Sequence, residues 1–342
     1  MIVTLIVLLL ICIYGIKNGR KYAYEGYTSK DRSNAIKGIF ILIVFISHIK
    51  NYIVDAGYKY QGIGDTVFQT FFSLIGQLMV VMFLFYSGYG VMESIRRKGE
   101  TYVKAMPKKR VLNTLVNFDL AVCFFLVVDL LIGKEVTVEK FLFSLMAWDS
   151  LGNSAWYIFA ILACYLLTSI ISRFAKTETM LLGGVFISLT IMALGLVFVK
   201  ESWWYDTLWA YPTGMFFSIY KKNIDDLADR KWWLAIGILL FLFCVLYFFP
   251  FDVAGFKHNA MSVVFAFLIV VLTMRIKIDN KALRWCGEQL FPLYIYQRIP
   301  MIVFAAVLPA WMLNEHPLVY IGICFLSTLV LAYLYKFIRI SL

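Results

Sequence analysis

The sequence carries little charge for its length. Only 15% of its 342 residues are Asp, Glu, Lys or Arg, whereas 62% are hydrophobic and 18% are aromatic. Soluble domains are about half apolar and about one quarter charged, so this composition excludes a soluble globular fold. Prolines are few, and neither a Pro-rich linker nor a polar domain interrupts the apolar runs. We therefore expect an all-α polytopic membrane protein with no soluble catalytic domain fused to it.

Cysteine and histidine are also scarce. There are three histidines, and the six cysteines occur singly, without a C-x-x-C pair or another spacing typical of metal ligands. All six cysteines lie within or at the edge of apolar stretches, where cysteine behaves as a small core residue. The sequence predicts neither a disulfide framework nor a metal site.

An excess of positive charge is present, because the formal net charge is +11. The basic residues cluster in short connections between apolar stretches, which is the pattern that the positive-inside rule produces. This explanation accounts for the charge without a nucleic-acid partner, and we expect none. The lipid bilayer is the partner that the composition indicates.

Eleven apolar stretches are long enough, or nearly so, to cross a hydrocarbon layer of about 30 Å. Lys and Arg are frequent in every second connection between them and rare in the others. This alternation predicts that the N-terminus lies outside and the C-terminus in the cytoplasm. The stretch 133–153 is expected to lie along the membrane surface as an amphipathic segment. The eleven stretches are 1–16, 34–54, 67–92, 108–132, 154–173, 179–199, 203–218, 231–249, 256–274, 286–307 and 316–338.

The second stretch carries two ionisable residues that a membrane helix rarely contains. Lys37 lies near its start and His48 lies eleven residues later. In an α-helix this spacing brings both side chains to nearly the same angle, about 16 Å apart along the axis. Ionisable groups inside a membrane usually face a cavity or a protein partner. Asn51 lies on the same face as Lys37 and His48, so this face of the helix becomes polar toward its C-terminal end.

From Lys37 to His48 the chain resembles the first core helix of the acyltransferase-3 family, bacterial membrane proteins that move acyl groups onto envelope acceptors. Further segments resemble motifs of that family in the same order: Phe83-Leu84-Phe85-Tyr86-Ser87-Gly88-Tyr89, Lys108-Lys109-Arg110, Ala155-Trp156-Tyr157-Ile158, Tyr211-Pro212-Thr213-Gly214 and Leu293-Tyr294-Ile295-Tyr296-Gln297. Two positions depart from the pattern, since Lys37 replaces the usual Arg and Gln297 stands where many members carry His. Lysine keeps the charge but loses the planar fork of donors.

The resemblance divides the chain into two parts and implies an activity. Residues 1–30 form an additional N-terminal transmembrane helix with a basic loop, and residues 31–342 form the acyltransferase-3-like membrane domain. The implied enzyme is a membrane O-acyltransferase of the bacterial plasma membrane. Its donor is cytoplasmic acyl-CoA, with acetyl as the acyl group by family habit, and it binds no resident cofactor. Its acceptor is a hydroxyl of a cell-envelope glycan or of a lipid-linked sugar.

Acyl transfer needs a base for the alcohol proton and a stabiliser for the oxyanion. We assign His48 as the base, because the unperturbed pKa of imidazole, about 6.5, lies near operating pH. Asn51, on the same face, is expected to orient the ring. Arg298, twelve residues into its span, has two explanations. It stabilises developing charge, or it forms a structural ion pair with Asp119 or Asp129.

The remaining candidates are assigned to the two substrates. Lys37, Ser87 and Arg110 are expected to contact the donor. The alternative for Lys37 is a lysine that extends to the interface or pairs with Asp119. The alternative for Ser87 is helix packing by small residues. For Arg110 it is a basic charge that only sets the orientation in the membrane. Trp156 and Tyr157 are expected to stack on acceptor sugars, and Asp206 to bind acceptor hydroxyls. The alternative for the aromatic residues is an interfacial belt.

Two other classes of function remain open at this point. A transporter or flippase of an envelope precursor would also have many helices with intramembrane charges, although no pair of broken helices is visible in corresponding halves. A catalytically inactive family member acting as a scaffold or sensor fits the departures at Lys37 and Gln297. The sequence leaves the oligomeric state open.

Overall fold

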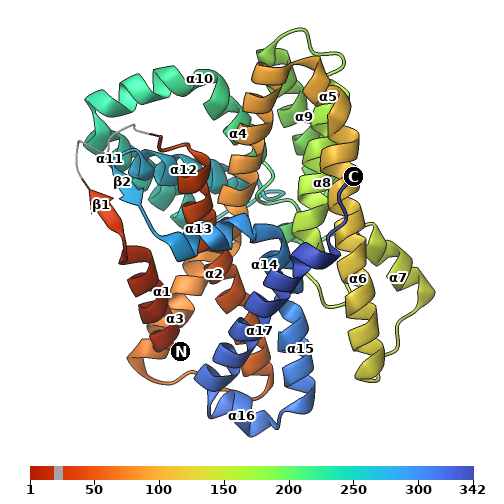
Figure 1. Ribbon diagram of the computed structural model, residues 1–342. Coiled ribbons are helices and arrows are strands. Elements are labelled where there is room, and N and C mark those ends of the chain that lie inside the picture. Colours follow the sequence, from red (N-terminus) through yellow and green to blue (C-terminus); the bar gives the residue numbers. More distant parts are fainter. Residues whose placement is uncertain (19–25) are drawn as a thin grey trace.

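The computed structural model describes residues 1–18 and 26–342 and is almost entirely helical (Figure 1). Arg20 and Lys21 of the basic loop lie outside the described residues. The first half of the chain contains α1 Ile2–Ile13, β1 Ile16–Asn18, α2 Lys30–Asp55, α3 Gly62–Ile75, α4 Val81–Lys98, α5 Glu100–Met106, α6 Asn113–Leu131, α7 Val138–Leu145 and α8 Ala155–Ile171. The second half contains α9 Glu178–Leu196, α10 Ala210–Arg230, α11 Trp232–Phe248, α12 Phe256–Thr273, β2 Ile276–Ile278, α13 Lys281–Glu288, α14 Leu290–Tyr296, α15 Arg298–Val307, α16 Ala310–Asn314 and α17 Pro317–Ile338.

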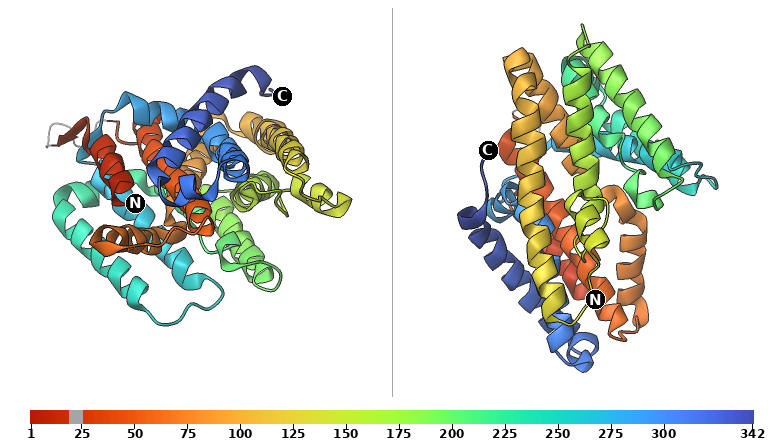
Figure 2. Two further views of the ribbon diagram at one scale, coloured as in Figure 1. Left: turned by 90° about the horizontal axis from the view of Figure 1, so that it is seen from below. Right: turned by 90° about the vertical axis from the view of Figure 1, so that its right-hand side faces the viewer.

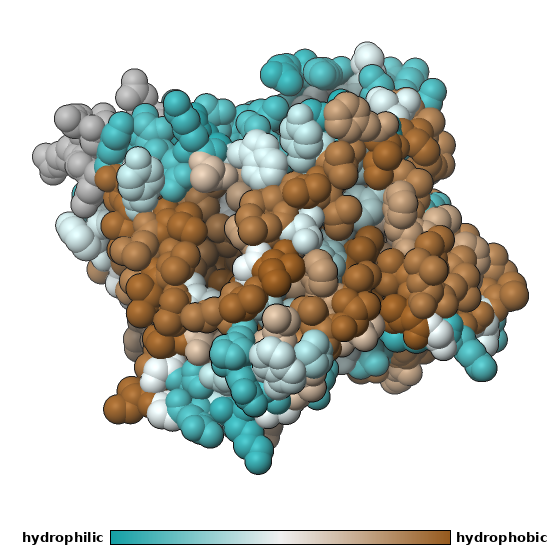
Figure 3. Space-filling model, turned by 60° about the horizontal axis from the view of Figure 1, so that its bottom comes forward, coloured by the Kyte–Doolittle hydropathy of each residue, from teal (hydrophilic) through white to brown (hydrophobic). Residues whose placement is uncertain are grey.

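The helices form a bundle whose surface is suited to a bilayer. Figure 3 shows a broad hydrophobic surface between hydrophilic regions at the top and bottom of the view. The connections α4–α5 and α8–α9 lie together at the top of Figure 1. Because the last turn of α4 carries Arg97 and Lys98 and the α8–α9 connection carries Arg173 and Lys176, we call this end of the molecule the basic end. The all-helical polytopic prediction is confirmed.

The predicted number of eleven spans is not confirmed. Among the described residues, seven helices are long and apolar enough to cross a membrane, or eight if one bent pair is a single span. Helix α1 has only 12 residues and α8 has 17, whereas a crossing needs about 20. Helices α10 and α11 are long and apolar enough to cross a membrane only as a pair, with a bend of 105° between them. Hydropathy locates apolar stretches but does not show where the helix axis breaks.

The loop 133–153 contains the amphipathic helix that the sequence predicts. Helix α7, Val138–Leu145, begins with the Thr137 side chain, which accepts a hydrogen bond from the backbone N–H of Lys140 at 3.2 Å. Leu142 and Met146 remain exposed on its surface. This exposure fits a segment that lies against lipid.

Helices α5 and α6 continue into one another through a π-helical turn, Pro107–Leu112, which contains Arg110. Figure 2 (right) shows the resulting long helix in gold, side by side with α8 in green. π-Helical turns are rare and occur often at functional sites. The wider turn changes the direction in which Lys108, Lys109 and Arg110 project from the helix.

Two helix pairs approach closely enough for their backbones to touch. Where α4 crosses α10, a Cβ on Gly88 would lie 2.0 Å from the Tyr211 carbonyl oxygen, and a Cβ on Gly214 would lie 2.0 Å from that of Phe85. Where α2 crosses α13, Gly38 faces the Leu283 carbonyl in the same way, at 2.0 Å. Only glycine permits such an approach. The α4–α10 crossing therefore joins two motifs that lie far apart in the sequence.

A short antiparallel ribbon attaches the N-terminal segment to the bundle. Strand β1 pairs with β2, with Ile16 opposite Ile278. Next to this ribbon the Lys17 ammonium donates to the Asp279 carboxylate at 3.0 Å, and this hydrogen bond lowers the pKa of Asp279. The Asn280 side chain donates to the Ile11 carbonyl at 2.9 Å. Helix α1 is thus fixed to the α12–α13 connection.

Replacing Gly88 with alanine tests the backbone contact. The new methyl group would overlap the Tyr211 carbonyl, so α4 and α10 must move apart, and overpacking of this kind costs about 1–3 kcal/mol. We expect Gly88→Ala to lower the Tm of the detergent-purified protein. Gly90→Ala on the same helix is the control, because a Cβ there meets nothing within 4 Å. Equal Tm values for both variants and the wild type would contradict the contact.

Candidate active site

His48 lies seven residues before the end of α2, in the half of the helix farther from the basic end. Its side chain is half-buried. The Nε2 atom lies 3.4 Å from the Ser154 hydroxyl, and the ring centre lies 6.4 Å from that of Tyr294. Among the described residues, no side chain or backbone group hydrogen-bonds to Nδ1. One ring nitrogen therefore has a protein partner, and the other is buried without one among the described residues.

A tight turn positions Ser154 opposite His48. The Ser150 hydroxyl lies 3.1 Å from Asn153 Oδ1, and the same oxygen accepts from the Leu151 N–H at 3.0 Å. Gly152 has a φ of 96°, a conformation that glycine adopts without strain. Asn153 is buried, so the turn is enclosed by the bundle. These contacts fix the residue that directly precedes α8.

Arg298 is half-buried where α14 passes into α15, close enough to His48 for the two to interact electrostatically. Its Nε donates to the Tyr52 hydroxyl at 3.3 Å. No carboxylate of the described residues lies within 4.0 Å of its guanidinium, and Asp129 pairs instead with Lys134 at 3.2 Å. The predicted structural ion pair with Asp119 or Asp129 is therefore wrong. A half-buried cation without a carboxylate partner can bind an anion or a developing negative charge.

Tyr157 belongs to the surroundings of His48, whereas Trp156 turns away from it. The Tyr157 ring centre lies 5.0 Å from that of Tyr294 and 5.9 Å from that of Phe83. Trp156 packs against a small separate core that includes Trp204 and Tyr205. The two neighbouring aromatic residues thus have different environments, as expected for side chains about 100° apart on a helix.

Ser87 and Arg110 are brought together through a cluster of tyrosines. Tyr165 on α8 lies beside Ser87, and its ring centre is 5.9 Å from the Arg110 guanidinium. Arg110 Nε also donates to the Tyr102 hydroxyl at 3.2 Å. The predicted donor residues from α4 and from the π-helical turn therefore share one environment. It lies nearer the basic end than His48 does.

Lys37 lies in the first half of α2 and is half-buried. The carboxylate that interacts with it is Glu288 on α13, not Asp119, so the predicted pairing with Asp119 is wrong. Lys37 and His48 are about 16 Å apart along the helix axis. They therefore belong to different levels of the bundle.

Asn51 and Asp206 lie outside the surroundings of His48. Asn51 is exposed and lines a cavity of about 390 Å³ with Lys50 and Tyr60. No hydrogen bond joins it to His48, and among the described residues the group within hydrogen-bonding distance of the ring is the Ser154 hydroxyl. The expectation that Asn51 orients His48 is therefore wrong. The spacing placed both residues on one side of α2, but it gave no information about the α8 residue that faces the ring.

Asp206 lines a different cavity, of about 280 Å³, beside Lys257 and His258. The carboxyl is buried, and among the described residues nothing hydrogen-bonds to its Oδ1. Burial, together with the nearby Asp252, raises the pKa of Asp206 to about 8. A protonated carboxyl both donates and accepts hydrogen bonds, as a ligand hydroxyl requires.

Tyrosines connect the two levels of the bundle. Tyr165 interacts with Tyr157 along α8, and Tyr157 contacts Tyr294, which is adjacent to His48. The Tyr294 hydroxyl lies close to Ser154, is buried, and has no hydrogen-bond partner among the described residues. The sequence analysis did not assign these tyrosines or Ser154. Tyr294 lies inside a recognised motif and Ser154 immediately precedes one, which is the only signal that pointed to them.

Comparisons with known proteins identify the family of the chain. A family model described as "Acyltransferase domain", that of acyltransferase-3, matches residues 31–336. Searches of curated proteins and of solved structures found no match. The match covers nearly the whole chain and includes every helix that contributes to the surroundings of His48. The chain therefore belongs to the acyltransferase-3 family of membrane acyltransferases.

Proposed function

We propose that the protein transfers an acetyl group from cytoplasmic acyl-CoA to a hydroxyl of a cell-envelope glycan or lipid-linked sugar, in the bacterial plasma membrane. The observation that carries this proposal is that His48 and Arg298 lie near enough to interact electrostatically. His48 has one ring nitrogen without a partner, and Arg298 has no carboxylate within 4.0 Å among the described residues. A free base beside an uncompensated cation meets the two requirements of acyl transfer to an alcohol.

In the proposed reaction, His48 Nδ1 takes the proton of the acceptor hydroxyl. The alcohol oxygen attacks the thioester carbonyl and forms a tetrahedral intermediate with an oxyanion, which the Arg298 guanidinium stabilises. The C–S bond then breaks, and the thiolate leaves with the proton that the imidazolium returns. The products are the ester and free CoA thiol. No covalent acyl-enzyme is required.

Ser154 and Tyr294 have supporting roles in this proposal. The Ser154 hydroxyl, 3.4 Å from Nε2, accepts a hydrogen bond from the Nε2–H and so keeps the lone pair on Nδ1. Selection of one tautomer by a hydrogen bond to the other ring nitrogen is a common way to position a histidine. The unpartnered Tyr294 hydroxyl is available as a second donor to the oxyanion.

The two substrates reach His48 from opposite ends of the bundle in this proposal. Lys37, Ser87 and Arg110 contact the donor on the side of the basic end, which faces the cytoplasm by the positive-inside rule. Tyr157 contributes an aromatic face to the acceptor sugar, and Trp156 supports it from the adjacent small core. The Asp206 cavity holds hydroxyls of a more distant part of the glycan.

Replacing His48 with glutamine tests the assigned base. Loss of a general base typically lowers the rate 10²- to 10⁴-fold, so we expect His48→Gln to lose at least 99% of acetyl transfer. Purified protein in lipid would receive radiolabelled acetyl-CoA and envelope glycan extract. His316→Gln, at an exposed histidine near the start of α17, is the matched control and should keep full activity. Equal transfer by both variants would refute the assignment.

Replacing Arg298 with glutamine separates stabilisation of the oxyanion from a structural role. Removing one oxyanion donor typically costs 10²- to 10³-fold in kcat, and we expect a loss in that range with little change in Tm. Arg230→Gln, at an exposed arginine with no ion pair among the described residues, is the control. A large fall in Tm together with normal kcat would show instead that Arg298 maintains the fold.

A further inference from the structure

We propose that the cavity between the basic-end termini of α4, α5, α8 and α9 binds the phosphate groups of a nucleotide. This inference rests on the proposed function: the nucleotide is the phosphate-bearing part of the acyl-CoA donor. The volume of the cavity is about 740 Å³, and small-molecule and cofactor sites typically enclose about 300–1,000 Å³. A nucleotide therefore fits the space.

The charges around this cavity favour an anion. Two carboxylates line it, but Glu178 is paired with Arg96 at 3.1 Å and Glu100 with Lys104 at 2.9 Å. Arg173 and Lys176 also line it, and neither forms an ion pair with any described residue. The two cations that remain are suited to phosphate, because arginine offers a bidentate fork and lysine a point charge.

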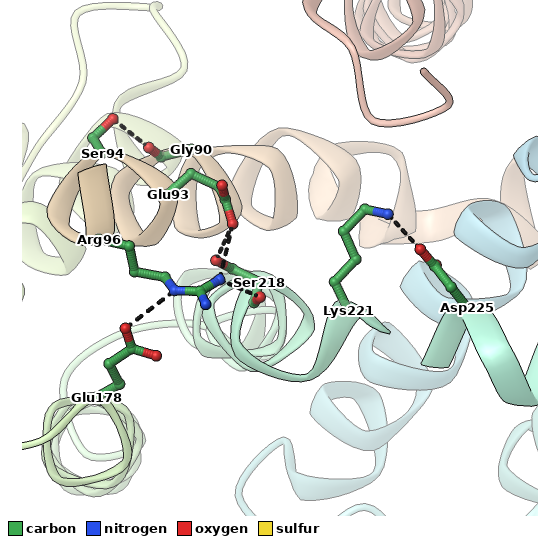
Figure 4. A network of polar contacts seen from close by, with 8 residues as sticks. All are labelled: Gly90, Glu93, Ser94, Arg96, Glu178, Ser218, Lys221 and Asp225. Carbon is green, nitrogen blue, oxygen red and sulfur yellow. Dashed lines mark hydrogen bonds and ion pairs between the residues drawn. The ribbon is translucent and has the colours of Figure 1, made fainter. Parts of the chain in front are cut away.

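The wall of the cavity is held in place by a polar network. Figure 4 shows Arg96 of α4 between Glu178 of α9 and the backbone of Ser218 on α10. Arg96 donates to the Ser218 carbonyl at 2.9 Å, and the Ser218 hydroxyl donates to Glu93 at 2.6 Å. Glu178 is thus engaged on the protein side and does not repel an anion as a free carboxylate would. A ligand that meets a wall of this kind loses little free energy to ordering it.

The position of the cavity matches a donor whose phosphates are remote from its reactive carbon. Val103 of α5 and Arg173 after α8 line the cavity. On the same two helices, Tyr102 directly precedes Val103, and Tyr165 lies deeper along α8 than Arg173; both tyrosines contact Arg110. From Ile171, the last residue of α8, to Tyr157 the helix rises about 21 Å, at 1.5 Å per residue. A long flexible arm is required to bridge this distance, and acyl-CoA has one between its phosphates and its thioester.

Direct binding of adenosine 3′,5′-bisphosphate, which lacks the arm and the thioester, tests the site. Calorimetry on the full-length protein in detergent should show binding that weakens with added salt. The double variant Arg173→Gln/Lys176→Gln should bind at least tenfold more weakly. The control Lys222→Gln/Arg230→Gln removes two exposed charges from the second half of α10 and should bind as the wild type does.

Measurements on the active-site variant separate this inference from the proposed function. His48→Gln should bind the bisphosphate normally even though it transfers no acetyl. In acetyl transfer, the double variant should raise the KM for acetyl-CoA with kcat nearly unchanged, as expected for lost ground-state binding. Bisphosphate affinity that is equal in the double variant and the wild type would overturn the nucleotide site, whatever the acetyl transfer. Binding without any acetyl transfer would support the site and refute the proposed function.

Discussion

The close backbone contact of paired helices is the constraint on which the structure depends. Gly88 and Gly214 bring α4 against α10, and Gly38 and Gly287 bring α2 against α13. In a membrane the hydrophobic effect does not drive helices together, so association relies on van der Waals packing, which small residues maximise. Helix α2 carries Lys37 and His48, and α13 leads directly into α14 and α15, which carry Tyr294 and Arg298. The glycines therefore set the position of the imidazole relative to the guanidinium.

The second feature is the placement of polar groups that a membrane protein cannot hold without cost. His48, Tyr294 and Arg298 all lie in helical segments that are long and apolar enough to cross a membrane. His48 Nδ1 and the Tyr294 hydroxyl have no hydrogen-bond partner among the described residues, and the Arg298 guanidinium has no carboxylate of those residues within 4.0 Å. Unpaired polar groups at this depth are expensive, and they persist where function requires them. Tyr157 and Tyr165 of α8 extend this series of polar groups toward the basic end.

Sequence reasoning predicted a membrane-length helix that carries Lys37 and His48, and the structure confirms that helix as α2. A lysine and a histidine in an apolar stretch are rare enough to be informative without any knowledge of their neighbours. The same reasoning failed for Asn51, because angle along one helix does not show which residue of another helix faces it. Ser154 occupies that position, and it lies in a turn that has no periodicity.

The number of spans and the partners of Arg298 were also beyond the sequence. Hydropathy over a window cannot distinguish a straight helix from two helices that meet at 105°, as α10 and α11 do. Asp129 is one of the two acidic residues that the sequence offers as a partner for Arg298, but it pairs with Lys134, which is only five residues further along the chain. A contact within one segment of the chain thus pairs the Asp129 carboxylate, which sequence reasoning had offered to the distant Arg298.

The central claim is that one site accepts a donor from the basic end and an acceptor from the opposite end. Sidedness of transfer in sealed, oriented vesicles tests it most directly. With the basic end facing outward, radiolabelled acetyl-CoA would be supplied only outside, and glycan acceptor only inside. The account predicts labelled glycan in the lumen and none with His48→Gln. Label that appears only when donor and acceptor share the same side would contradict it.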